Sequence, residues 1–284
     1  MVTAFLIFFA LVLEYVYDPV SNMKDTVVID KYFLKLKDLL KDYKLEKIYI
    51  YFVFPILVIL VFIILDNFLY YFFHPFFSFL LSLIVLLYCL KPNEFNQKLD
   101  SLKFSIDAKA DLDDTKRFKY ILYSHKADEL DSIINNIFYN SIRNIFSVLF
   151  TFLLLGPAGC LGYILIDNYI YSDQIKIDQK SKKYIKLIIA LIEYLPIRIC
   201  AFTFAVVANF ELCLGKWRSL KKEKDVYNLN INLINSVGAA SFKSNDDNEK
   251  SIIDKIIYSQ SMISRSLLAW LSIIGFLVIS GVFI

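Results

Sequence analysis

The sequence has few of the residues that most enzymes and flexible linkers use. Only seven glycines and six prolines occur in 284 residues, so long disordered linkers are not expected. There are two histidines, His74 and His125, and no phosphate-binding loop, dinucleotide fingerprint, HExxH or GxSxG motif. His74 is expected at a membrane interface beside a proline, and His125 in a solvated loop. No catalytic residue is predicted, and the sequence identifies no metal ligand set.

Cysteine and net charge are also low. The four cysteines lie in or beside apolar stretches without any CxxC pair, which predicts buried small hydrophobic residues rather than a disulfide framework or a zinc site (Cys89, Cys160, Cys200 and Cys213). The formal net charge of +3 is too small to indicate nucleic-acid binding.

Apolar residues, by contrast, make up 57% of the chain and fall in blocks long enough to cross a bilayer, which takes about 20 helical residues. Six such blocks predict an all-α, polytopic transmembrane bundle forming one integral membrane domain over residues 1–284. The blocks cover residues 1–17, 48–65, 68–90, 142–166, 185–214 and 267–284. Only Asp66 and Asn67 separate the second block from the third, which predicts a tight hairpin turn there. The first block is short and contains Glu14, so it is the weakest span.

The distribution of lysine and arginine predicts the orientation in the membrane. Three segments are rich in basic residues, which favours the cytoplasmic side, namely 18–47, 91–141 and 215–266. The connector 168–184 is poorer in basic residues. Six spans then place both termini in the periplasm, whereas a first block lying on the surface would move the N-terminus inside. The three basic segments also carry apolar residues at helical spacing, which predicts amphipathic cytoplasmic helices. The helix near residues 29–43 is expected on the inner leaflet or on the other loops.

Polar residues within or beside the apolar blocks are the candidate ligand-binding residues, because such residues are costly in lipid and face the bundle interior. They are Glu14, Arg143, Glu193, Arg198, Asn209 and Glu211. Arg143 and Arg198 are available to pair with the buried carboxylates. Two interpretations remain open: structural pairing between helices, and a ligand site.

The fourth block is interrupted by the sequence LLLGPAGCLGY. Pro157 removes a backbone hydrogen bond, while Gly156 and Gly159 permit close approach. Pro196 interrupts the fifth block in a similar way. Two interrupted spans facing one another would form a ligand pocket. Tight packing of small residues is the alternative explanation.

Two segments resemble the AmpE family of membrane proteins. They are NSIRNIFSVLFTFLLLGPAGCLGYIL (Asn140 to Leu165) and LPIRICAFTFAVVANFELCLGKWR (Leu195 to Arg218), with LLYCLKPNEFNQKLD and RSLLAWL in matching order. The sequence departs from the family pattern at Thr151, Ile164 and Asn209, where tryptophan, arginine and aspartate are usual. The matching positions are Arg143, Gly156, Pro157, Gly159, Arg198, Asn209, Phe210 and Glu211.

The resemblance implies an inner-membrane protein that modulates β-lactamase induction or senses cell-wall fragments. Its expected partners are the lipid bilayer, a muropeptide or other small molecule, and a cytoplasmic regulatory partner. No cofactor is predicted. The AmpE family is in turn similar to the CobD/CbiB enzymes of cobalamin biosynthesis. That similarity implies the alternative, an ATP- and magnesium-dependent amide ligase whose metal would lie near Glu14, Asp18, Glu94 and Glu211. A transporter is disfavoured because no inverted repeat is visible.

Overall fold

The computed structural model describes residues 2–17, 27–39, 47–107, 130–172, 174–220, 223–242 and 251–281. Throughout these ranges the regular structure is helical, without a strand. The all-α prediction is therefore confirmed for this part of the chain. His125, Asp18 and much of the three lysine-rich segments lie outside the described residues.

The chain divides into two compact units. Unit 1 comprises residues 1–90 and 148–192, and unit 2 comprises residues 91–147 and 193–284. The elements of unit 1 are α1 (Val2–Val16), α2 (Val27–Leu39), α3 (Lys47–Phe68), η2 (Leu69–Phe73), α4 (Pro75–Cys89), α8 (Ser147–Tyr171) and α9 (Gln179–Ile192). The elements of unit 2 are α5 (Pro92–Asp107), α7 (Leu130–Ser141), η4 (Ile142–Phe146), α10 (Tyr194–Val207), α11 (Phe210–Ser219), α12 (Val226–Ala240) and α13 (Ile252–Ile279). The prediction of one membrane domain with three cytoplasmic segments stays a prediction.

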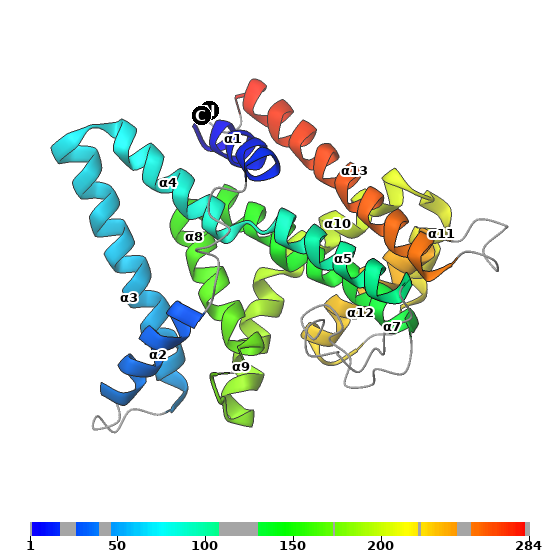
Figure 1. Ribbon diagram of the computed structural model, residues 1–284, viewed down its shortest axis with the longest axis horizontal. Helices are drawn as coiled ribbons and strands as arrows, with labels where there is room; N and C mark the ends of the chain where they lie inside the picture. The colour runs from blue at the N-terminus through cyan, green and yellow to red at the C-terminus, as the bar shows by residue number, and fades with distance from the viewer. Residues whose placement is uncertain are drawn as a thin grey trace. The chain divides into compact units, whose positions relative to one another are not determined.

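The hairpin between α3 and α4 exists, but its turn is not at Asp66 and Asn67 as predicted (Figure 1). The helix continues past both residues because the polar side chain of each has a hydrogen-bond partner. Asn67 donates to the carbonyl of Ile63, and Asp66 accepts a 2.6 Å hydrogen bond from Ser78 on α4. The turn lies at His74, which is extended because a proline follows it. The Nδ1 atom of His74 accepts from the backbone N–H of Phe76 and caps α4.

Helix α2 packs one face on α3 and α8, and its expected position on the inner leaflet or on the other loops stays a prediction. The side chain of Phe33 is fully buried, with its ring 4.8 Å from that of Tyr169 on α8 and 5.6 Å from that of Tyr51 on α3. Tyr32 and Leu39, which the helical pattern assigned to the same apolar face, are mostly exposed. Apolar side chains therefore lie on more than one side of this short helix.

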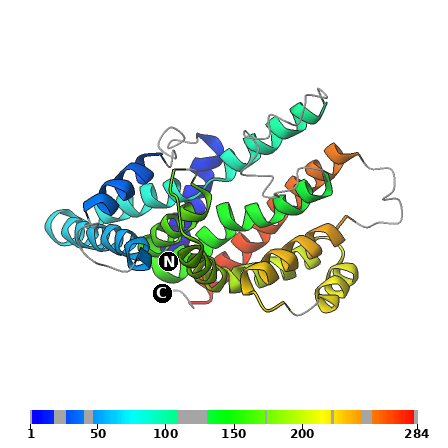
Figure 2. The same cartoon turned by 90° about the horizontal axis from the view of Figure 1, so that it is seen from below.

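Unit 2 is a bundle in which α7 packs against both α12 and α13, and these three helices run side by side (Figure 2). Its core is aromatic. The ring of Phe138 on α7 lies 5.6 Å from that of Phe204 on α10 and directly against Gly238 on α12. A Cβ atom added at Gly238 would come within 2.3 Å of the Phe138 ring, so this glycine sets how closely the two helices approach.

Four helical stretches in the described residues are long and apolar enough to cross a membrane. They are Tyr49–Phe73, Pro75–Ile106, Asn136–Tyr171 and Ile252–Ile279. Helices α9 and α10 pass the same test only as a pair joined at a bend, which makes up to five candidates. Helix α1 has 15 residues and a length of about 22 Å, which is short of a hydrocarbon core of about 30 Å. The fold is compatible with a membrane protein, and the sixth span stays a prediction.

Candidate functional site

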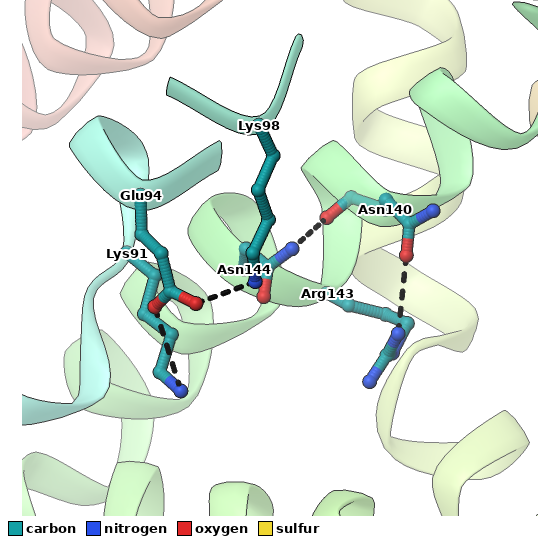
Figure 3. A network of polar contacts seen from close by, with 6 residues as sticks. All are labelled: Lys91, Glu94, Lys98, Asn140, Arg143 and Asn144. Carbon is teal, nitrogen blue, oxygen red and sulfur yellow. Dashed lines mark hydrogen bonds and ion pairs between the residues drawn. The ribbon is translucent and has the colours of Figure 1, made fainter. Parts of the chain in front are cut away.

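A cluster of six polar residues in unit 2 forms the candidate site (Figure 3). We call it the Arg143 cluster, and it consists of Lys91, Glu94, Lys98, Asn140, Arg143 and Asn144. Three of these residues lie at the start of α5 and three lie where α7 runs into η4. The backbone N–H of Lys91 donates to the carbonyl of Asn144 at 3.3 Å, which holds the beginning of α5 against η4.

The side chains of the cluster make hydrogen bonds within each of the two segments, and the backbone bond from Lys91 to Asn144 joins the segments. Arg143 Nη1 donates to Asn140 Oδ1 at 3.1 Å, and Asn144 Nδ2 donates to the Asn140 carbonyl at 2.9 Å. On α5, Lys98 donates to Glu94, whose other oxygen lies 3.9 Å from Lys91 Nζ. The cluster therefore presents fixed donors rather than freely rotating chains, as a preorganised site requires.

Arg143 is the most informative member because it carries a permanent charge and is only 7% exposed. It lies in η4, a single turn of π-helix closed by the bond from Ser147 N–H to the Ile142 carbonyl. Such π-turns are rare and frequently mark functional sites, since they insert one residue into an otherwise regular helix.

The charges of the cluster favour an anion. Three of its residues are cationic and one is a carboxylate. Glu193, a buried carboxylate of unit 2, accepts a 2.9 Å hydrogen bond from Tyr139, which lies on α7 one turn before Arg143. Burying cations is costly unless negative charge accompanies them. Planar guanidinium and flexible ammonium groups together suit carboxylate or phosphate oxygens.

Arg198 lies in the same unit, but its contacts hold two helices together. Its Nη1 atom donates to the Tyr194 carbonyl at 2.8 Å and to Asn230 Oδ1 at 3.1 Å, and its guanidinium stacks 3.2 Å from the centre of the Tyr194 ring. These contacts join α10 to α12. The predicted pairing of Arg198 with a buried carboxylate is thus replaced by neutral partners.

Asn209 and Glu211 are exposed residues at the beginning of α11. The Asn209 side chain accepts from the Leu212 N–H at 3.2 Å and so caps the helix, while Glu211 lies in its first turn. Both positions stabilise a helix N-terminus by ordinary means, so helix capping accounts for both residues without a ligand.

The remaining predicted residues belong to unit 1. Glu14 is fully buried in α1. The break in α8 is confirmed: Gly156 has φ +67° and ψ −160°, a conformation that only glycine adopts readily, and Pro157 starts the second half of the helix. A Cβ at Gly159 would lie 2.3 Å from Leu155 Cβ, so close packing explains this glycine. The predicted pocket shared with Pro196 and Arg198 of unit 2 stays a prediction.

The sequence pattern missed a buried polar network in unit 1. Asp30 on α2 is 2% exposed and accepts hydrogen bonds from Asn168 Nδ2 at 2.7 Å and from the Ser172 hydroxyl at 2.6 Å. On its own helix, Asp30 looks like one of many solvated charges beside lysines. In unit 2 a usable signal was present, because Asn136, Asn140 and Asn144 recur every four residues near an apolar span.

The cysteine prediction is confirmed: Cys89, Cys160, Cys200 and Cys213 are free and buried. Within the described residues, no group of three or more His, Cys, Asp or Glu side chains is arranged to hold a metal ion. In comparisons with protein-family models, curated proteins and solved structures, nothing matches the chain.

Proposed function

We propose that the chain is an inner-membrane regulatory protein of the AmpE kind, which binds a small anionic ligand at the Arg143 cluster. One observation carries the proposal: a buried arginine in a π-helical turn is hydrogen-bonded to Asn140, in a cluster that also holds Asn144, two lysines and a single glutamate. The described part of the chain has four helices long and apolar enough to span a bilayer, or five if the bent pair α9 and α10 is one span. The ordered donors and positive excess of the cluster suit carboxylate or phosphate oxygens.

The ligand class follows from this chemistry together with the family resemblance. Cell-wall muropeptides carry several carboxylates, and a membrane protein with a cationic site facing the cytoplasm would sense them as they are recycled. The lysine-rich segments 18–47, 91–141 and 215–266 would face the cytoplasm and contact a regulatory partner that passes the signal to β-lactamase induction. Reporter fusions within these three segments are expected to be cytoplasmic, and a periplasmic result would contradict this orientation.

The second candidate is an ATP- and magnesium-dependent amide ligase of the CobD/CbiB kind. The observation that favours it is the position of Glu94 within the Arg143 cluster. Lysine and arginine side chains bind phosphate oxygens, and a carboxylate beside them would hold Mg²⁺ on the same phosphates. Under this candidate the purified protein consumes ATP when it is given a corrinoid acid, and the gene restores a cobalamin-pathway mutant.

A binding titration separates the two candidates and tests both. The full chain in nanodiscs is titrated with an anhydro-muropeptide, with the same compound after amidation of its carboxylates, and with ATP and Mg²⁺. For Arg143→Gln we expect at least about tenfold weaker binding of the charged probe, because a hydrogen bond to a charged group contributes about 1.5–3 kcal/mol. Arg143→Lys keeps the charge and is expected to lose less.

The matched control is Arg265→Gln on α13, an exposed arginine of the same unit. Equal affinities for Arg143→Gln and the unsubstituted chain would exclude the Arg143 cluster as the binding site. If deletion of the gene does not change β-lactamase induction, the proposed regulatory role is contradicted. That result would not contradict the proposed binding site.

A further inference from the structure

Two polar side chains on α13 are buried but make no hydrogen bond within the described residues. They are the Ser266 hydroxyl and the indole N–H of Trp270. Ser266 is fully buried and Trp270 is 6% exposed. Being four residues apart on one helix, they lie on the same face. Buried polar groups are almost always satisfied, so a pair of unsatisfied groups at one place requires an explanation.

Other serines of the same helix donate their hydroxyl to the backbone carbonyl four residues earlier. Ser259 donates to the carbonyl of Lys255 at 2.8 Å, and Ser272 donates to that of Leu268 at 2.9 Å. Ser266 does not use the corresponding bond to the preceding turn. The indole of Trp270 has no such alternative, because it has a single donor that points away from its own backbone. Trp270 is therefore the more decisive of the two residues.

The pair lies next to the π-helical turn η4, a kind of turn that is frequent at functional sites. The Trp270 ring lies 5.2 Å from that of Phe146, the last residue of the π-helical turn η4, in an edge-to-face arrangement. Phe146 also contacts Phe204 of α10, so the indole packs on the edge of an aromatic core. A donor in such surroundings binds an acceptor strongly, because water does not compete for it.

We propose that Ser266 and Trp270 form a binding site for an oxygen acceptor, supplied by an acyl or phosphoryl group that enters between α13 and η4. Tryptophan only donates, so the ligand atom must carry lone pairs, as carbonyl, carboxylate and phosphoryl oxygens do. The oxygen could come from a phospholipid or from a small soluble molecule. The inference goes beyond the proposed function, and it holds or fails whatever the Arg143 cluster binds.

The test uses Trp270 as its own reporter. The chain has two tryptophans, so Trp217→Phe leaves Trp270 as the only indole. Ultraviolet resonance Raman spectra report whether an indole N–H is hydrogen-bonded. We expect a hydrogen-bonded signal in the protein as purified, its loss after exhaustive delipidation and dialysis, and its return with a probe. Return with phosphatidylglycerol identifies a lipid source, and return with inorganic phosphate identifies a soluble one.

Other results overturn the site. A signal without a hydrogen bond in the purified protein would mean that no acceptor is present. A signal that survives stripping unchanged would mean that a protein group or an ordered water is the acceptor. Failure of both probes to restore a signal lost on stripping would exclude this ligand class. As a second readout, Trp270→Phe is expected to weaken binding of the restoring probe about fivefold, while Trp217→Phe leaves it unchanged.

Discussion

The two units bury charge in different ways. In unit 1 the carboxylate of Asp30 accepts from two neutral donors, Asn168 near the end of α8 and Ser172 directly after it, both more than 130 residues away in sequence. In unit 2 the guanidinium of Arg143 lies in a cluster that contains two further cations and one carboxylate. The first arrangement is closed on itself and ties α2 to α8. The second contains three cations and one carboxylate, and it is the cluster for which we propose an anionic ligand.

The largest effect is expected at Asp30. Asp30→Ala leaves the buried Asn168 amide and the Ser172 hydroxyl without their acceptor, at about 1–3 kcal/mol each, so we expect a loss of roughly 2–6 kcal/mol in the free energy of unfolding. Asp30→Asn keeps one acceptor and should lose less. Unfolding by SDS in mixed micelles measures both. Asp38→Ala, an exposed aspartate of the same helix, is the control, and an equal loss there would refute the role of burial.

A somewhat smaller loss is expected at the break in α8. Gly156→Ala forces a residue with a Cβ into φ +67° and ψ −160°, which costs about 1–3 kcal/mol of unfolding free energy. Gly275→Ala is the matched control in unit 2, because that glycine is helical and has open space around it. The control should be neutral or slightly stabilising. Thermal unfolding in detergent compares the two, and equal melting temperatures would contradict the strain at Gly156.

Within unit 2, substitution of Arg198 is expected to lower stability, and substitution of Arg143 is expected to weaken ligand binding. Arg198→Lys removes the planar stack on Tyr194 and the fixed bond to Asn230, so we expect a loss of about 1 kcal/mol in unfolding free energy without weaker ligand binding. Arg143→Lys should weaken binding of a carboxylate probe instead. Parallel unfolding and titration of both variants checks this. Weaker ligand binding by Arg198→Lys would contradict this expectation and show that Arg198 contributes to the ligand site.

The smallest effect concerns Cys213 on α11. Burial raises the pKa of the Cys213 thiol above its usual range, so the reactive thiolate is scarcer at neutral pH and forms only at higher pH. In a background without the other three cysteines, Cys213 should react more slowly with maleimide than a cysteine placed by Ser219→Cys on the exposed end of the same helix. Equal rates at neutral pH would mean that unit 2 opens readily around α11.

How much the sequence predicts depends on the range of the interactions. Four long apolar helices and the break at Gly156 follow from local composition and appear in the described residues, whereas the block 185–214 is divided among α9, α10 and α11. The hairpin turn was misplaced because Asp66 is satisfied by Ser78 across the turn. The Asp30 network depends on a partner 138 residues away, which no local pattern indicates. Arg143 was recognisable as a charge near an apolar span, but its neighbours Lys91 and Lys98 were indistinguishable from other basic loop residues.

Native mass spectrometry of the purified full chain tests the central claim most directly. We predict that a small anionic molecule remains bound to the unsubstituted chain and to Arg265→Gln, and that it is absent or much reduced in Arg143→Gln with the fold retained. An anionic ligand that stays bound to Arg143→Gln at the same occupancy would contradict the proposed site.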